Sequence, residues 1–351
     1  MIWMGQNTNH LQDKKATIDA MIDCIKSHGF EKYPAPEGFP ELKKLILKDL
    51  NLNDNFEALI TAGGTEALYL TMNVLLSEKD NVITPDPGYG IIDNFAGRFA
   101  GEIRPVDIYS PDNNYKLTPE LVKQNMDENT KIIVLIDPLN PLGSGYTDEE
   151  IKEFAKIAEE NNLYLLHDIT YRDFAENHTL VTKYTERAVI AYSFSKVFGM
   201  AGLRLGAIVS NTKIIDAVRT IIINDVGTNV VAQAGAIAAL KTKSSWVNEL
   251  YTQCRKNQEI IKEAVDQVEG AYLPVYPSQG NMMIINIKET GVDSEVLAEY
   301  LLEKKLFVRQ GSYTSAKYGH EYIRISFSIP EEQIQVFAKE FVEAMEYLRK
   351  K

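Results

Sequence analysis

The chain has 351 residues, of which 45% are hydrophobic and 25% charged, and its formal net charge is −12. That length exceeds a typical single compact unit and the acidic balance disfavours polyanions, so we expect two domains and no nucleic-acid partner. No apolar stretch is long enough to span a bilayer, and residues 1–9 lack the order of a secretory signal, so we expect a cytoplasmic protein with no membrane partner. Cys24 and Cys254 lie far apart with no CxxC motif or histidine cluster around them, which predicts two ordinary thiols and no metal site.

From about residue 56 to 210, short β-rich runs alternate with helical segments, which is the pattern of an α/β domain. Several runs are continuously apolar, as buried parallel strands are. Two helix starts are marked by capping signals, Thr118 before Pro119 and Thr147 before Glu150. The expected strands cover residues 58–61, 81–84, 102–108, 131–136, 163–167, 189–193 and 205–209.

After residue 243 the pattern changes to that of a smaller α+β domain. We assign residues 36–255 to the large domain, and residues 1–35 and 256–351 to the small one. The expected elements here are a long helix over 245–268, strands over 282–287 and 322–328, a helix over 294–304 and a final helix from Glu331.

The most informative stretch is Ser-Phe-Ser-Lys at 193–196, followed by Gly-Leu-Arg-Leu-Gly at 202–206. A lysine just past a buried strand, with hydroxyls before it and Arg204 after it, suits a reactive amine beside a phosphate site. An amine that forms an imine must be partly unprotonated, which burial and nearby positive charge favour. On chemistry alone, a structural role for a buried Lys196 is about as plausible.

These two motifs resemble the cofactor-lysine signature of fold-type I pyridoxal-phosphate (PLP) enzymes, aminotransferase class I/II. The resemblance implies that Lys196 holds PLP as a Schiff base, and that Ser193, Ser195 and Arg204 bind the cofactor. It also implies an α/β fold, with a PLP-transferase-like large domain built on a mostly parallel seven-stranded sheet and a smaller α+β domain. Further motifs follow in the family's order over nearly the whole chain.

Three of these motifs are turns. The glycine turn at 61–68 resembles the family's phosphate-binding turn, which implies that Gly64 and Thr65 bind the cofactor phosphate. Free N–H groups at a helix start can bind a phosphate. The turn Pro-Asp-Pro-Gly-Tyr at 85–89 resembles a turn of the family, and this resemblance implies that Tyr89 stacks on the pyridine ring. The loop at 137–143 resembles Asn-Pro-x-Asn-Pro-Thr-Gly and places Asn140 at the cofactor's phenolic oxygen. Without the resemblance, all three are ordinary turns or packing sites.

The 137–143 loop departs from the family pattern at two positions, because Asp137 replaces the first asparagine and Leu142 the threonine. These changes put the local hydrogen bonding of the loop in question. Asn140 itself is retained.

Two apolar runs each contain one charged residue. Asp168 ends an apolar run, and the resemblance pairs it with the protonated pyridine nitrogen, while a salt bridge or a helix cap is the structural alternative. Tyr171 matches the tyrosine that donates to the phenolic oxygen, and His167 is expected to be structural. Arg324 interrupts another apolar run and needs an anion, which the resemblance makes the substrate's α-carboxylate and which an internal carboxylate would otherwise supply.

Two further residues concern partners and substrates. Tyr33 matches a tyrosine that reaches the phosphate of the neighbouring subunit, which implies a homodimer, although a tyrosine here is otherwise an anchor. Arg309 resembles a substrate-phosphate arginine of the histidinol-phosphate aminotransferase branch, with a surface arginine as the alternative. The segment 38–42 instead resembles the aspartate and aromatic branch, so the two cues disagree on substrate.

The motifs together imply a PLP-dependent aminotransferase that moves an amino group between an amino acid and a 2-oxo acid. A decarboxylase, lyase or synthase on the same fold is the alternative, because the motifs do not say which bond at Cα breaks. A nicotinamide dehydrogenase would need a GxGxxG turn, which Gly63-Gly64 does not supply. A regulator built on this fold would carry a DNA-binding module, and no basic appendage is seen.

Overall fold

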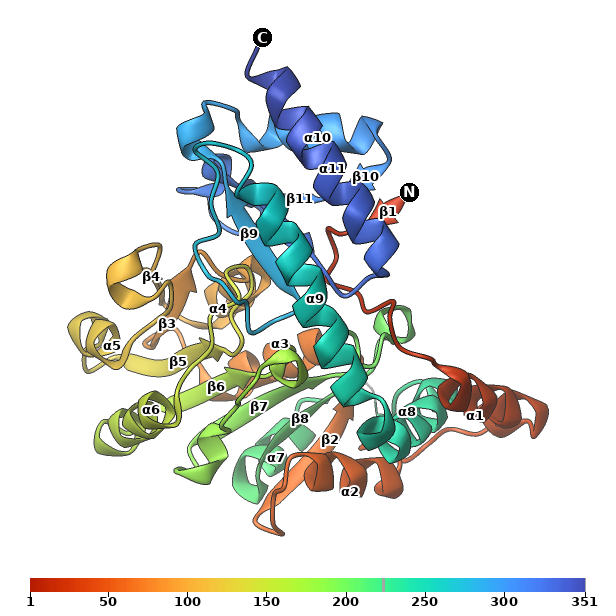
Figure 1. Ribbon diagram of the computed structural model, residues 1–351. Coiled ribbons are helices and arrows are strands. Elements are labelled where there is room, and N and C mark those ends of the chain that lie inside the picture. Colours follow the sequence, from red (N-terminus) through yellow and green to blue (C-terminus); the bar gives the residue numbers. More distant parts are fainter. Residues whose placement is uncertain (223–224, 351) are drawn as a thin grey trace.

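A computed structural model describes residues 1–222 and 225–350, and its largest element is a seven-stranded sheet (Figure 1). The strand order is β2-β8-β7-β6-β5-β3-β4, and only β8 runs antiparallel to its neighbours. The expected mostly parallel sheet is confirmed, with strand ends within two residues of those predicted. The strands are β2 (Phe56–Thr61), β3 (Asn81–Asp86), β4 (Glu102–Asp107), β5 (Thr130–Ile136), β6 (Tyr164–Asp168), β7 (Ala188–Ser193) and β8 (Gly206–Asn211).

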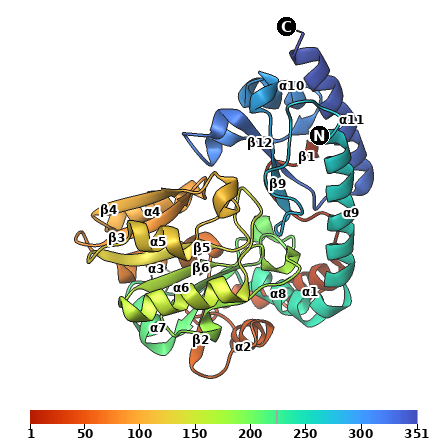
Figure 2. The ribbon, with the colours of Figure 1, turned by 60° about the vertical axis from the view of Figure 1, so that its left-hand side comes forward.

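Helices cover both faces of this sheet, as the buried, continuously apolar strands require (Figure 2). The capping signals are confirmed: the Thr118 hydroxyl accepts from the Leu121 N–H at 3.2 Å, and Thr147 and Glu150 form a complete capping box. The helices are α2 (Pro40–Asp49), α3 (Gly64–Leu75), α4 (Gly90–Phe99), α5 (Pro119–Asn125), α6 (Asp148–Glu160), α7 (Thr212–Arg219) and α8 (Val230–Thr242).

The smaller α+β unit lies above the carboxyl ends of the parallel strands and is joined to them by the long helix α9 (Val247–Val265) (Figures 1 and 2). Its sheet is antiparallel, in the order β11-β12-β9, and α11 packs along α9. The remaining elements are β9 (Met282–Asn286), α10 (Ser294–Glu303), β10 (Leu306–Phe307), β11 (Arg309–Gln310), β12 (Tyr322–Ser326) and α11 (Glu331–Leu348).

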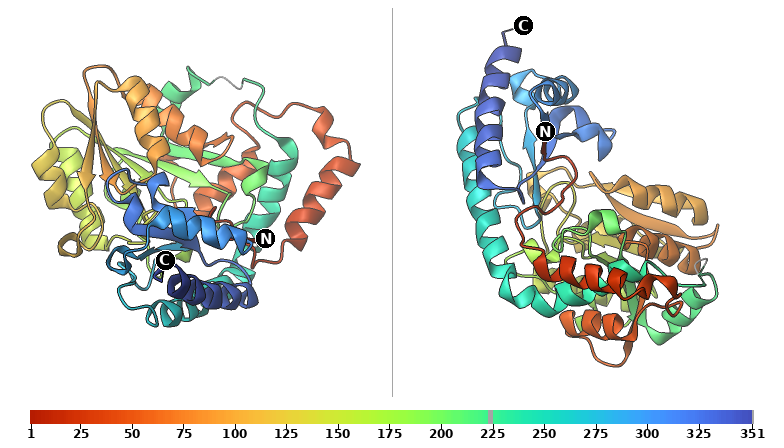
Figure 3. Two further views of the ribbon diagram at one scale, coloured as in Figure 1. Left: turned by 90° about the horizontal axis from the view of Figure 1, so that it is seen from above. Right: turned by 90° about the vertical axis from the view of Figure 1, so that its right-hand side faces the viewer.

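The N-terminal residues contact both parts of the molecule. Strand β1 (Ile2–Trp3) pairs in parallel with β10, whereas α1 (Lys15–Lys26) packs on α8 (Figure 3). The domain boundaries at residues 36 and 255 stay a prediction. One apolar core continues from the large sheet through α9 into the small sheet, so Phe194 and Phe327 belong to the same cluster.

Both cysteines are free, and Cys254 is buried in α9. Among the described residues, no helix combines the length and the apolarity needed to cross a membrane.

Candidate active site

A cavity of about 300 Å³ opens where the parallel strands end and the small unit covers them. Ligands gather at this edge of open α/β sheets because loops and helix starts converge there. Tyr33 lies away from the cavity with 81% of its surface exposed. The other predicted site residues line it: Gly64, Thr65, Tyr89, Asn140, Asp168, Tyr171, Ser193, Ser195, Lys196, Arg204, Arg309 and Arg324.

One end of the cavity is suited to a phosphate. Helix α3 begins at Gly64, and no side chain caps it, so its first N–H groups are free to bind an anion. Gly63 has a φ of 91°, and a Cβ there would lie 2.5 Å from a terminal nitrogen of Arg204. Only glycine therefore lets the guanidinium approach the helix start. The Ser193 hydroxyl accepts from the Ser195 N–H at 3.2 Å beside it.

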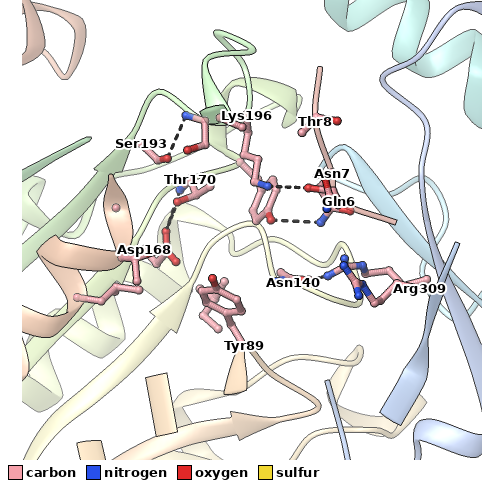
Figure 4. Close-up of a pocket in the computed structure, with 18 of the residues that line it drawn as sticks. Gln6, Asn7, Thr8, Tyr89, Asn140, Asp168, Thr170, Ser193, Lys196 and Arg309 are labelled. Carbon is pink, nitrogen blue, oxygen red and sulfur yellow. Dashed lines mark hydrogen bonds between the residues drawn. The ribbon is translucent and has the colours of Figure 1, made fainter. Parts of the chain in front are cut away.

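Lys196 projects into the middle of the cavity, where its Nζ donates to the Gln6 carbonyl at 2.8 Å (Figure 4). Burial, reinforced by Arg324 and Arg204, lowers the pKa of Lys196 to about 7. An ordinary lysine would be unprotonated in only about one molecule in 3,000 at pH 7, whereas this lowered pKa leaves a far larger share of the amine unprotonated. The structure thus supplies the nucleophilic amine that imine chemistry needs.

Asp168 ends β6 with its carboxylate facing the cavity (Figure 4). Its Oδ1 accepts from the Thr170 hydroxyl at 2.6 Å and the Thr170 N–H at 3.1 Å. Burial raises the pKa of Asp168, although these hydrogen bonds and Lys196 oppose the shift. No described residue donates to Oδ2, so a cationic ring nitrogen would find an acceptor there.

Arg324 reaches the cavity from β12 in the small sheet. It donates to Asn140 Oδ1 at 2.7 Å and to the Gly5 carbonyl at 2.8 Å, while its buried Nε has no partner. No carboxylate among the described residues pairs with this guanidinium, so the structure does not bear out the internal salt-bridge alternative. Arg309 pairs with Arg324 across β11 and β12 and also donates to the Gly5 carbonyl, at 3.2 Å.

Nine lining residues were missed by the sequence analysis, and four of them form one segment, residues 5–8. That segment precedes the first recognised motif and has no pattern of its own. Thr170 was also missed, although a threonine two positions after a strand-ending aspartate is a common partner of the carboxylate. Tyr313 lies in a short 3-10 helix of the small unit, Gly311–Tyr313. The other three missed residues are the apolar Leu68, Ile136 and Ala201.

The contacts of Asp137 account for the departure of the 137–143 loop from the family pattern. Asp137 Oδ2 lies 3.3 Å from His167 Nε2 and 3.1 Å from His178 Nε2, and all three side chains are at least 90% buried. The Asp137 N–H also donates to the Asp168 carbonyl at 2.9 Å, so this cluster supports the strand end that presents Asp168. His167 is thus placed beneath the cavity and does not line it.

The three side chains have the composition of a metal site, with ligand atoms within 4.8 Å of one another. However, the Val181 N–H donates to His167 Nδ1 at 3.4 Å, which places the ring proton on Nε2. A metal-binding imidazole shows the opposite arrangement, with the free nitrogen facing the metal. The cluster therefore fits an aspartate that accepts from the His167 imidazole and lies beside the imidazole of His178.

We expect this cluster to make stability depend on pH. Burial alone would raise the pKa of Asp137, but the charge of His178 and the hydrogen bonds hold it well below its usual range, while burial lowers the pKa of His167. Both shifts mean that, as the pH falls, the unfolded chain takes up a proton at each group before the folded protein does. The free energy of unfolding therefore decreases below about pH 6.5 because of His167, and decreases again below about pH 4 because of Asp137.

Asp137→Asn should cost about 1–3 kcal/mol at pH 7, because two buried imidazoles lose the carboxylate beside them, and should remove the acid loss that lies below about pH 4. Thermal midpoints from about pH 7 to about pH 2 measure both effects. Asp112→Asn, at an exposed position, is the control. Equal midpoints for the two variants would contradict this account.

Comparison with known proteins assigns the fold and the family. Residues 1–341 match the family described as aminotransferase class I and II. An aspartate aminotransferase of Pyrococcus horikoshii is 30% identical over 341 residues, which cover 92% of this chain and 83% of that protein. A histidinol-phosphate aminotransferase of Methanococcus maripaludis is 30% identical over 95% of this chain and 87% of its own.

Solved structures agree on the fold. A Thermus thermophilus aspartate aminotransferase variant superposes with a TM-score of 0.85 at 22% identity, covering 97% of this chain and 95% of its own. The aromatic aminotransferase of Pyrococcus horikoshii gives 0.86 at 23% identity, covering 99% and 95%. At these identities the likeness shows the fold alone.

The sheet, the covering small unit and a reactive lysine between them define a fold-type I PLP enzyme. The chain belongs to the class I and II aminotransferases, and it is a PLP-dependent transaminase. The residues present fit the cofactor, because the cavity offers an uncapped helix start beside Arg204, an amine with a pKa near 7 and a buried carboxylate with a free oxygen.

Proposed function

We propose that the enzyme transfers the amino group of an amino acid to a 2-oxo acid, with PLP held on Lys196 as a Schiff base. One observation carries this proposal: four cations, Lys196, Arg204, Arg309 and Arg324, share the cavity with a single carboxylate, Asp168. Among the described residues, the four donate only to uncharged oxygens. Such an excess of unpaired positive charge calls for anionic ligands, namely a phosphate and at least one carboxylate.

Each of the predicted site residues contacts a particular part of the cofactor or of the substrate. The start of α3 and Arg204 bind the phosphate, Tyr89 stacks on the ring, and Asn140 and Tyr171 bind the phenolic oxygen. Arg324 binds the substrate's α-carboxylate and so directs the Cα–H bond toward Lys196.

When bound, PLP supplies the electron sink for the substrate carbanion. Lys196 Nζ, once the substrate amine has replaced it on the cofactor, would accept the proton from Cα, acting as a general base with a pKa close to the working pH. Asp168 keeps the ring nitrogen cationic.

The substrate carries a second anionic group, which Arg309 binds. Its guanidinium lies 5.0 Å from the Phe307 ring centre and 4.5 Å from that of Tyr313, so two rings hold it in place at the cavity wall. The segment 38–42, which resembles the aspartate and aromatic branch, has a structural role. Gly38 has a φ of 90°, and a Cβ there would lie 2.2 Å from Ile60 Cγ1, so the backbone requires glycine at this position. That segment does not line the cavity, so it carries no information on substrate.

A panel of amino donors tests both the transamination reaction and the binding of a second anionic group by Arg309. With aspartate or glutamate, Arg309→Ala should raise KM about 10- to 100-fold, because a charged hydrogen bond to the second anion is lost. With alanine or phenylalanine, the same variant should behave as the parent enzyme. Release of carbon dioxide or ammonia in place of a 2-oxo acid would favour the decarboxylase or lyase alternative, and an equal effect on all donors would remove Arg309 from the second subsite.

We further propose a cytoplasmic homodimer in which Tyr33 serves the phosphate site of the partner subunit. Supporting this, α1 and the turn after it expose several large apolar side chains on one protruding part of the molecule (Figure 3). These side chains are Ile18, Ile22, Ile25, Phe30 and Tyr33.

A further inference from the structure

The segment formed by residues 5–9 crosses the cavity wall and is tied to both parts of the molecule (Figure 4). On the large-domain side, Asn9 Nδ2 donates to the Val197 carbonyl at 2.7 Å. On the small-unit side, Asn281 Nδ2 donates to the Asn7 carbonyl at 3.0 Å, and Ser328 Oγ donates to the Thr8 carbonyl at 3.0 Å. The backbone of the segment is therefore held in one position, which fixes where its side chains point.

Asn7 is the member of this segment whose side chain contacts a predicted cofactor residue. It is only 1% exposed, and its Nδ2 donates to the Tyr171 hydroxyl at 3.2 Å (Figure 4). Its Oδ1 is buried without a partner, although Asn7 lines the cavity. Its backbone is left-handed, with a φ of 54°, a conformation that asparagine adopts more readily than most residues. A buried amide with one free oxygen and strained backbone is costly, which points to a task in the site.

We propose that Asn7 is a positioning residue that directs the Tyr171 hydroxyl proton toward the cofactor, an inference that rests on the proposed function. Because the Tyr171 oxygen already accepts from Asn7, its own hydrogen is left to donate elsewhere. A hydroxyl that accepts one hydrogen bond is also a stronger donor in the next. In agreement, the hydrogen bond from Asn7 opposes the rise that burial produces in the pKa of Tyr171.

The consequence concerns the nitrogen that links Lys196 to PLP. A strong donor on the phenolic oxygen withdraws negative charge from it, and the oxygen then holds the proton of the neighbouring nitrogen less tightly. Asn7 thereby lowers the pH at which this nitrogen loses its proton. The charged and titratable groups around Tyr171 are Arg324, Asp168 and Tyr89, and Arg204 also acts on Lys196. The substitutions below leave all of these groups in place.

The test is a pH titration of the visible absorption of the PLP-loaded protein. Asn7→Gly removes the side chain and keeps the left-handed backbone, and it should raise the midpoint by roughly 0.4–1 pH unit, the equivalent of one hydrogen bond. Asn7→Asp should raise the midpoint further, because the carboxylate accepts the Tyr171 proton and adds negative charge near the linkage. Asn9→Ala is the matched control, since it loosens the same segment without contacting Tyr171.

The outcomes separate the two levels of the proposal. A raised midpoint in the Asn7 variants with an unchanged midpoint in Asn9→Ala supports the positioning role. An unshifted Asn7→Gly, or an equal shift in Asn9→Ala, overturns that role while leaving the proposed function standing. A parent protein that shows no visible band with PLP overturns both. Dissociation constants for PLP, measured on the same proteins, should rise less than tenfold in Asn7→Gly.

Discussion

Replacing Lys196 by alanine is expected to lower kcat for transamination by roughly 10⁴-fold or more, because one amine serves as both covalent anchor and general base. The visible absorption band formed with PLP should disappear in the same variant. Capture of PLP by the parent apoprotein should accelerate with pH around a midpoint near 7, where burial and two arginines have placed the pKa of this amine.

Lys14→Ala is the matched control for this experiment. Burial also lowers the pKa of Lys14, but that side chain does not line the cavity. The control should therefore keep the PLP band. If Lys196→Ala transaminates at a normal rate, or if Lys14→Ala loses the band in its place, the assignment of the reactive amine is wrong.

Asp168→Asn has the second largest expected effect, a fall in kcat of about 10²- to 10³-fold, since the carboxylate stabilises the charge that develops on the ring. Asparagine has nearly the same shape, and its amide oxygen can still accept from Thr170, so the fold should be preserved. Single-turnover rates with a good donor measure the loss.

The PLP band distinguishes the causes of any loss in Asp168→Asn. A band of normal intensity together with slow proton transfer at Cα supports the electrostatic role. Full activity in this variant would show that the ring does not depend on the carboxylate. Asp173→Asn is a useful comparison, because Asp173 is another largely buried carboxylate, paired with Lys243 and outside the cavity.

Local sequence patterns predicted the strands, the helix caps and most of the charged residues that line the cavity. Continuous apolar runs mark buried parallel strands, and a capping box is a contact between residues three positions apart, so both are local properties. Lys196, Asp168 and Arg324 were found because each interrupts or ends an apolar run with a charge. A family resemblance then gave each charge a role, and the structure brings all three to one cavity.

Contacts between residues far apart in the sequence were found from the three-dimensional fold and not from sequence patterns. Asn7 and Tyr171 are 164 positions apart, and the polar stretch around Asn7 has no periodicity that would single it out. In the same way, the partner that Asp137 has in His178 lies in a later loop. Burial also decided the chemistry of Lys196, because its lowered pKa depends on surroundings drawn from both parts of the chain. These properties depend on long-range packing, which a local pattern of residues does not encode.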